Sequence, residues 1–226
     1  MTSLIRYLWP ANKPCIANNK SGATQSKSVV TSTAQAKRPN TTDITIAVAE
    51  SVTAGALANT LCSEPGASAF FKGGVVAYSI NSKKEILGVN IEYAERNNFA
   101  NPVTTSEMAR SVVKMFKARF GMATTGYSLP ITRPENKETG ECALDIKKPY
   151  AYICLYDSAL DIEYITREEF EYNINENPTI QKASVQARVA LKAKQMYENY
   201  KINNTATNAS IGITSIDITH TDYVTV

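Results

Sequence analysis

The chain has 226 residues, a net charge of +3, 43% hydrophobic and 20% charged residues. This length suits one ordinary domain with tails and is enough to bury a substantial core. The sequence has no apolar run of about 18 residues, which excludes a transmembrane helix. One His argues against a His-based metal site, and four scattered Cys argue against a disulfide framework or a zinc ribbon.

The charge is distributed unevenly along the chain. Residues 1–42 contain six Lys and Arg residues and no acidic residue, whereas residues 43–200 contain 17 basic and 19 acidic residues. Residues 201–226 add one Lys and two Asp. The body of the protein therefore lacks the basic surface of a nucleic-acid-binding domain, and only the N-terminal tail could bind a polyanion through charge.

Three interpretations of residues 1–42 stay open. The segment is basic and Ser/Thr-rich, and residues 18–42 have too few apolar side chains to offset chain entropy, which predicts a disordered tail. An acid-free, Ser-rich start is also typical of a mitochondrial-type transit peptide. Alternatively, the segment is an arm that orders on a partner, with Tyr7 and Trp9 as anchors.

The first half of the body alternates short apolar runs with helical patterns. Residues 43–49 (DITIAVA) predict a buried strand, and residues 56–62 predict a helix that Glu64-Pro65-Gly66 ends. Residues 70–78 predict a second strand, followed by a capped helical turn over 79–88 that stops at Gly88.

A 3.6-residue period predicts a helix over residues 104–120, with Thr104 or Thr105 as its cap and Glu107 completing a capping box. Its predicted apolar face comprises Met108, Val112, Met115, Phe116 and Phe120. Residues 122–126 predict a very short strand.

The second half of the body begins with a polar, irregular segment, 131–148, that predicts a loop. Residues 150–156 predict a strand and 161–172 an edge strand. Residues 178–200 predict a long helix with one face formed by Ile180, Ser184, Ala187, Leu191 and Met196. Among the cysteines, Cys62 and Cys154 are expected to be small core residues, which agrees with an intracellular, reducing compartment.

This order predicts an α/β fold: a three-layer-like α/β sandwich with a mixed sheet and helices on its faces, over residues 43–200. N- and C-terminal extensions of 1–42 and 201–226 flank it. The C-terminal extension is β-rich, and residues 211–226 fit either an extra edge strand of the same sheet or a strand offered to another chain.

Ser51 and Thr53 stand where the first strand turns into a helix. Free backbone N–H groups and the positive end of a helix dipole at such a turn suit an anion, or an oxyanion beside a nucleophile. The alternative is that either residue is only a helix N-cap.

The stretch from Ala49 to Val89 (AESVTAGALANTLCSEPGASAFFKGGVVAYSINSKKEILGV) resembles the C-terminal domain of CinA-type proteins, a family that includes nicotinamide mononucleotide deamidases. The family pattern runs approximately ESxTGG, a helix, then PGxSxxFxGGxVAYSxxxKxxLLGV. Weaker matches extend the resemblance to about residues 43–200.

The resemblance implies a Ser/Lys amidohydrolase that cleaves the carboxamide of nicotinamide mononucleotide or a related amide, with no metal and no cofactor. Carried onto matching positions, Ser51 is the nucleophile, Lys83 the general base, and Tyr78 lines the site. Family membership also implies a homo-oligomer. The substrate-binding positions that it implies are Thr53, Gly55, Gly73, Gly74, Ser79, Thr125 and Gly126.

A lysine can act as a base only if burial or nearby positive charge lowers its pKa. The sequence offers Lys84 and Lys72 as like-charged neighbours of Lys83.

Three departures from the family pattern bear on activity. Ala54 replaces a glycine and adds a Cβ where the backbone needs a close approach or a positive φ. A Gly-rich loop is replaced by a segment in which Tyr127 and Leu129 fill space with side chains. The strand before that loop is expected to be shortened, which would shift the loop relative to Ser51.

These departures keep an alternative open, in which the fold is a catalytically degenerate structural or interaction subunit. Its partner, or a second copy, would then bind residues 1–42 and 211–226. A third possibility is a phosphate-binding regulator without catalysis.

Overall fold

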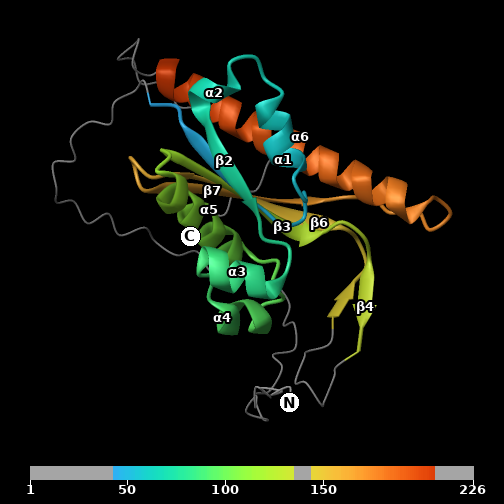
Figure 1. Ribbon diagram of the computed structural model, residues 1–226. Coiled ribbons are helices and arrows are strands. Elements are labelled where there is room, and N and C mark those ends of the chain that lie inside the picture. The colour runs from blue at the N-terminus through green and yellow to red at the C-terminus, as the bar shows by residue number, and fades with distance from the viewer. Residues whose placement is uncertain (1–42, 135–143, 207–226) are drawn as a thin grey trace, which may run out of the picture.

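The computed structural model describes residues 43–134 and 144–206, and its middle layer is a five-stranded sheet in the order β2-β1-β3-β6-β7 (Figure 1). β1 pairs in parallel with β2 and β3, while β6 and β7 continue the sheet antiparallel. β4 and β5 form a separate two-stranded hairpin. The strands are β1 (Ile46–Glu50), β2 (Phe71–Val76), β3 (Phe120–Tyr127), β4 (Ile131–Arg133), β5 (Leu144–Ile146), β6 (Tyr150–Asp157) and β7 (Ile162–Glu169).

Helices cover both faces of the sheet, which confirms the predicted three-layer α/β sandwich. Figure 1 shows α1, α2 and α6 on one face and α3, α4 and α5 on the other. The helices are α1 (Ala56–Cys62), α2 (Ala67–Phe70), α3 (Ile80–Leu87), α4 (Ile91–Arg96), α5 (Pro102–Phe116) and α6 (Pro178–Ala206). The short helices α2 and α4 were not expected, since helices of four and six residues are too short to show a period.

The alternation of side chains along β1 divides the core into two clusters. Ile46 and Val48 pack with the residues of α1 and α6, whereas Ala47 and Ala49 pack with those of α5. Small residues on the second face let α5 approach closely. A Cβ on Gly121 of β3 would lie 2.1 Å from the carbonyl oxygen of Ala109 in α5.

The three parallel strands end at the same edge of the sheet. The chain leaves β1 through α1 to reach β2, and then crosses back over β1 through α3, α4 and α5 to reach β3. The direction of the connections therefore reverses at β1, which is where open α/β sheets bind their ligands. The loops that follow β1, β2 and β3 lie at this edge.

The boundary between the helix of residues 104–120 and the next strand was predicted wrongly. α5 ends at Phe116, Lys117 adopts a left-handed conformation (φ 52°), and Phe120 begins β3. β3 is consequently an eight-residue strand instead of a shortened one. Met115 was predicted on the buried face of α5 but is 44% exposed, whereas Met108 and Val112 of that face are fully buried.

The predicted start of α5 and the predicted loop also need correction. The N-cap is Asn101, whose side chain accepts a hydrogen bond from the Thr104 N–H, so neither Thr104 nor Thr105 is the cap. Within residues 131–148, β4 and β5 pair as a hairpin.

The buried face of α6 differs from the predicted one. Ile180 is 68% and Leu191 53% exposed, and the residues that pack on the sheet are Val185, Val189, Ala190, Ala193, Tyr197 and Tyr200. Of the predicted face, Ser184 and Ala187 are also exposed, and only Met196 packs against the core, partly buried. Cys62 is exposed, contrary to expectation, while Cys154 is buried as expected.

The predictions for residues 1–42 and 211–226, including the transit peptide, the arm and the extra strand, lie outside the described residues. No helix within the described ranges is long and apolar enough to span a membrane.

Candidate active site

Ser51 and Lys83, 32 residues apart in the chain, meet at the carboxyl edge of the sheet. Ser51 follows β1, and Lys83 lies in α3 after β2. The Nζ atom of Lys83 is 2.9 Å from Ser51 Oγ and donates to the carbonyl oxygens of Ala77 at 2.8 Å and Tyr78 at 3.3 Å. The pairing that the resemblance implies is therefore present in the geometry.

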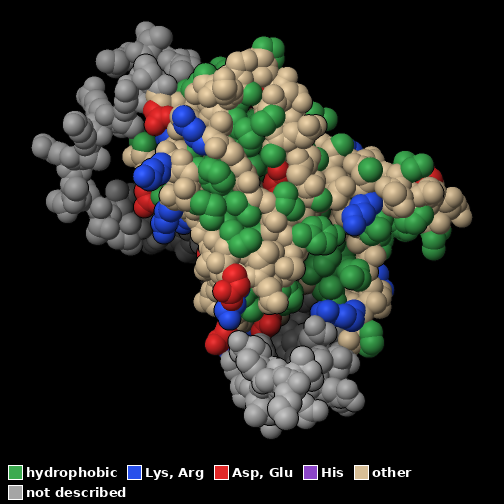
Figure 2. Space-filling model, in the orientation of Figure 1, with side chains coloured by type: hydrophobic (Ala, Val, Ile, Leu, Met, Phe, Trp, Pro, Cys, Tyr) green, Lys and Arg blue, Asp and Glu red, His purple; other side chains and the backbone are tan. Residues whose placement is uncertain are grey.

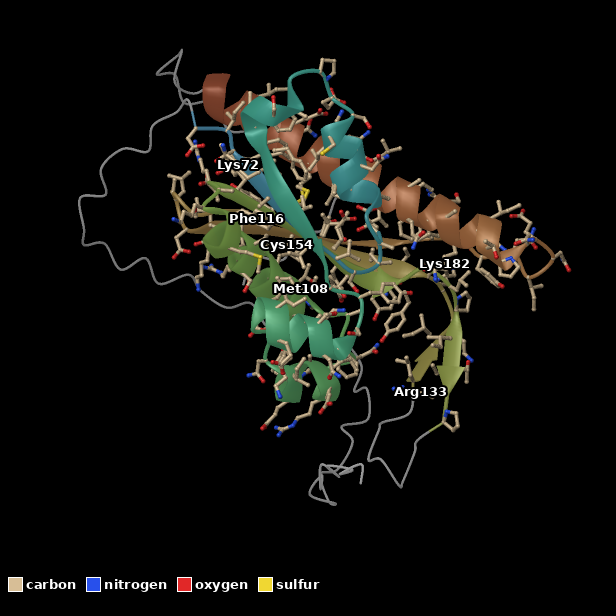
Figure 3. The ribbon with its side chains drawn as sticks, viewed as in Figure 1. Lys72, Met108, Phe116, Arg133, Cys154 and Lys182 are labelled. Atoms are coloured by element: carbon tan, nitrogen blue, oxygen red, sulfur yellow. The ribbon has the colours of Figure 1, made fainter. Side chains whose placement is uncertain are left out.

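Burial makes Lys83 a weaker base than an ordinary lysine. Its side chain is almost fully enclosed, at 4% exposure, and desolvation lowers its pKa from 10.5 to about 8. The predicted contribution of neighbouring positive charge is wrong, because desolvation alone accounts for the shift. Lys84 points to solvent and pairs with Glu85, and Lys72 lies at the opposite end of β2 (Figure 3).

Glu50, the last residue of β1, anchors the loop that carries Ser51. Its side chain is 1% exposed and accepts hydrogen bonds from the N–H groups of Gly55 (2.9 Å), Leu57 (3.0 Å) and Ala58 (2.7 Å). The carboxylate therefore accepts the hydrogen bonds of these N–H groups at the start of α1. The sequence predicted free N–H groups here that could bind an anion, and for these three groups that prediction is wrong.

Thr53 and the end of β3 fix the loop from the other side. The N–H of Ser51 donates to the carbonyl oxygen of Thr124 at 2.9 Å, and the hydroxyl oxygens of Thr53 and Thr124 are 2.6 Å apart. Thr53 is 1% and Thr125 2% exposed. β3 thus reaches the level of Ser51, which contradicts the expected displacement of the loop after it.

Tyr78 and Ser79 contribute to the site in different ways. The Tyr78 side chain is 58% exposed, and Lys182 from the start of α6 donates to its hydroxyl oxygen at 3.4 Å. Ser79 is the N-cap of α3, and its hydroxyl accepts from the Ser82 N–H. Ser79 therefore positions the helix that carries Lys83.

Gly73 and Gly74 lie in the middle of β2 and away from the loop edge. A Cβ at Gly73 would lie 2.5 Å from the Phe116 ring, and a Cβ at Gly74 would lie 2.5 Å from a methyl of Val48. Packing thus explains both glycines, and the structure does not bring them to Ser51 as the substrate-binding prediction requires.

Ala54, which stands where the family pattern has a glycine, has the positive φ that the sequence analysis considered. Its φ is 51°, and the following Gly55 has φ 102°. A non-glycine residue in the left-handed region is strained by contact between its Cβ and the backbone. The chain therefore carries local strain three residues after Ser51.

Ala54→Gly is expected to raise the free energy of unfolding by about 1 kcal/mol, because it removes this strain. The control is Ala187→Gly on the exposed side of α6, which should lower it by about 1 kcal/mol. Urea unfolding of both variants checks the sign, and a loss of stability in Ala54→Gly would contradict the expectation.

An aromatic cluster occupies the segment where the family has its Gly-rich loop. The Tyr127 hydroxyl donates to Asn98 Oδ1 at 2.8 Å, and Asn98 Nδ2 donates to the Tyr150 hydroxyl at 3.1 Å. The two tyrosine rings pack edge to face, with centroids 5.7 Å apart. Burial raises the pKa of both hydroxyls. Gly126 is required here, since a Cβ would lie 2.2 Å from the Tyr150 carbonyl oxygen.

Three of these features were missed from the sequence: the bonds of Glu50, the Asn98 bridge and the approach of Lys182 to Tyr78. Glu50 was noted only as a matching letter of the motif, and the other two join residues far apart in the chain. Within the described ranges, no three His, Cys, Asp or Glu side chains gather as a metal site would need.

The family model for the CinA C-terminal domain matches residues 27–163, more than half of the chain. The chain belongs to the CinA C-terminal domain family. A CinA-like protein of Trichodesmium erythraeum is 32% identical over 156 residues, which are 68% of this chain and 33% of that protein. One of Flavobacterium psychrophilum is 37% identical over 106 residues, 47% of this chain and 25% of that protein. This chain thus matches only a quarter to a third of these CinA relatives.

Solved structures of the CinA superfamily share the fold. Competence damage-inducible protein A from Klebsiella pneumoniae matches with a TM-score of 0.54 and 21% identity, over 72% of this chain and 88% of that one. The Escherichia coli CinA superfamily protein matches with a TM-score of 0.51 and 22% identity, over 68% and 81%. At these identities the likeness concerns the fold alone.

Proposed function

We propose that this CinA-family domain hydrolyses a carboxamide by Ser/Lys catalysis, with nicotinamide mononucleotide or a related amide as its substrate. The observation that carries the proposal is the buried contact of 2.9 Å between Lys83 Nζ and Ser51 Oγ. A serine hydroxyl becomes a good nucleophile only when an adjacent base takes its proton.

The hydrogen bonds of Lys83 suit the neutral amine that a base requires. A neutral amine has two N–H donors and one lone pair, and Nζ has two carbonyl acceptors, those of Ala77 and Tyr78. Nζ also donates to Ser51 Oγ when the lysine is protonated. In the neutral amine of the proposed reaction, the two N–H groups remain with the carbonyls, and the lone pair is left to accept the Ser51 proton. Burial supports this form because it lowers the pKa of Lys83 to about 8.

In the proposed reaction, Lys83 Nζ takes the Ser51 proton as Oγ bonds to the carboxamide carbon. Lys83 then returns this proton to the leaving nitrogen, the carbon–nitrogen bond breaks, and ammonia departs from an acyl-enzyme. A water molecule, deprotonated by Lys83, attacks the acyl carbon and releases the carboxylate and the Ser51 hydroxyl.

The backbone N–H groups of Val52 and Thr53 are the proposed donors to the oxyanion of the tetrahedral intermediate. They directly follow the nucleophile, and no acceptor within residues 43–134 and 144–206 takes either of them. The N–H groups of Gly55, Leu57 and Ala58 cannot serve, since Glu50 holds them. Preorganised N–H groups of this kind stabilise developing negative charge.

Release of ammonia from nicotinamide mononucleotide by the full chain tests the proposal, with Ser51→Ala measured beside it. Turnover that disappears in Ser51→Ala supports the enzyme. A folded protein without turnover on this or related amides would favour the alternative of an interaction subunit, which rests on residues 1–42 and 211–226.

The rate of hydrolysis is expected to rise with pH through about 8. Below the pKa of Lys83 the amine is protonated and cannot accept the Ser51 proton, so the rate should fall about tenfold for each pH unit there. Above it the rate should level off. A profile of kcat/KM from pH 6 to 10 measures this, and a profile that falls between pH 7 and 9 would contradict Lys83 as the base.

A further inference from the structure

β2 is one of the two outer strands of the five-stranded sheet, and one of its edges is open. β1 pairs with its inner edge, and no strand within residues 43–134 and 144–206 pairs with its outer edge. The backbone N–H and C=O groups of a strand point alternately to its two sides. The groups on the outer side of β2 are therefore left to water or to a further strand.

The two outer strands differ in how well they are protected against pairing. β7 has the sequence IEYITREE, with four charged residues, and two ion pairs, Arg167–Glu169 and Lys192–Glu168, lie along it. Charged side chains on an outer strand discourage another strand from pairing with it. β2 has the sequence FKGGVV, in which Lys72 is the only charged residue. The open edge of β2 is therefore the one suited to an additional strand.

Exposed apolar side chains accompany this edge. Val76 at the end of β2 is 48% exposed, and Tyr78 and Ile80, which follow it, are exposed as well. Figure 2 shows hydrophobic side chains gathered in the middle of the visible face, where Figure 1 places β2. Apolar surface that is contiguous in this way marks an interaction site. A strand along β2 covers part of it with its own side chains.

The last turns of α6 lie next to the beginning of β2. The Nζ atom of Lys201 is 5.6 Å from the centre of the Phe70 ring, and Phe70 directly precedes β2. The Phe70 ring also lies 6.5 Å from the Tyr197 ring of α6, measured between centroids. Figure 1 shows this end of α6 beside α2 and the start of β2. The chain that continues from α6 thus sets out close to the open edge.

We propose that residues 211–226 of this chain bind along the outer edge of β2 as an additional strand of the sheet. Their sequence, IGITSIDITHTDYVTV, alternates β-branched residues with Ser, Thr and Asp, which is the pattern of a half-buried strand. Six of these residues match the length of β2. Because α6 ends beside the start of β2, the added strand runs parallel to β2.

A short connection favours the chain's own segment over a second copy as the occupant. Only residues 207–210 separate α6 from the segment, and four extended residues reach about 13 Å. A tether of this kind holds the segment at an effective concentration of about 1 mM, which a second copy in dilute solution does not match. Residues 211–226 are then not available as the partner-binding strand of an interaction subunit.

Amide hydrogen exchange of the full-length protein tests the inference, measured over β2 with and without prolines in the segment. The variant has six substitutions: Ile213→Pro, Thr214→Pro, Ile218→Pro, Thr219→Pro, Val224→Pro and Thr225→Pro. Every stretch of six residues in the segment then lacks an N–H that would point to β2, because proline has none. We expect the outward amides of β2 to exchange slowly in the unsubstituted protein and at least about 100-fold faster in the variant.

Two comparisons make this measurement specific. The amides of β1, which is paired on both sides, should exchange slowly in both proteins. Six prolines at the same spacing in the N-terminal tail, at positions 23, 24, 28, 29, 34 and 35, are the matched control and should leave β2 unchanged.

Four results would overturn the inference. They are fast exchange of the outward β2 amides in the unsubstituted protein, no change on adding the prolines, an equal effect of the prolines in the N-terminal tail, and a loss of protection across β1 as well as β2. Protection of β2 that disappears on dilution would also do so, because it would assign the edge to a second copy.

Discussion

Lys83→Met is expected to lower kcat/KM for amide hydrolysis by about 10³- to 10⁴-fold while making the protein more stable. The substitution keeps the length of the side chain and removes the amine that faces Ser51 Oγ at 2.9 Å. Ser51→Ala should cause a loss of similar size, and the double variant should lose no more than either single one. Residues that act as one unit show this lack of additivity.

The gain in stability separates a functional role from a structural one. A lysine that is 4% exposed, with a pKa of about 8, is held in the folded protein at a cost whenever it is protonated. Methionine removes this cost, although the carbonyls of Ala77 and Tyr78 lose their donor. If Lys83 served the fold, Lys83→Met would instead lower the midpoint of thermal unfolding.

The gain should depend on pH in a defined window. The pKa of Lys83 is lower in the folded protein (about 8) than in the unfolded chain (10.5), so unfolding takes up a proton between these values. The wild-type protein should therefore gain up to about 3 kcal/mol from this group as the pH rises from 8 to 10.5. The advantage of Lys83→Met should shrink over the same window. An advantage that stays constant, measured by urea unfolding at several pH values, would contradict the assigned pKa.

The core of the site was predictable because it lies in one local pattern. Ser51 and Lys83 fall in a stretch of about 40 matching residues, and a strand–loop–helix unit on either side fixes where the two side chains emerge. The α/β class with a mixed sheet could also be inferred from the order of strands and helices along the chain. The positions of Ser51 and Lys83 and the fold class depend on short segments in which the local sequence determines the local structure.

The parts that were missed depend on contacts between distant residues. Lys182 lies 104 residues from Tyr78, and Asn98 bridges tyrosines that lie 29 and 52 residues away. No periodicity marks such contacts. The buried face of α6 was predicted wrongly for a related reason, because only the packed sheet decides that small residues such as Ala190 and Ala193 lie inside.

Glu50→Ala is expected to lower the free energy of unfolding by about 3 kcal/mol and kcat by more than about 100-fold. Removing the carboxylate leaves the N–H groups of Gly55, Leu57 and Ala58 without the acceptor that now satisfies them. The loop of residues 51–55, anchored by these bonds, would then lose its fixed position. A nucleophile displaced by about 1 Å from its base loses most of its efficiency.

Asn101→Ala is the matched control, since Asn101 also caps a buried helix start. Its side chain is 7% exposed and accepts from the Thr104 N–H at 2.9 Å, at the beginning of α5 instead of beside Ser51. It should lose about 1 kcal/mol of stability and little activity. The comparison therefore separates general loss of stability from displacement of the nucleophile.

Two further measurements, the kcat of Glu50→Gln and the pH profile, test whether Glu50 is a positioning residue that acts through Ser51. Assayed below the unfolding transition, Glu50→Gln should recover part of the lost kcat, because the amide oxygen still accepts one or two of the three N–H groups. The pH profile should keep its rise near 8, because Lys83 and its carbonyl partners are untouched. A shifted profile would mean that Glu50 acts on the proton transfer itself. Unchanged kcat in Glu50→Ala would show that Ser51 keeps its position without the hydrogen bonds of the Glu50 carboxylate.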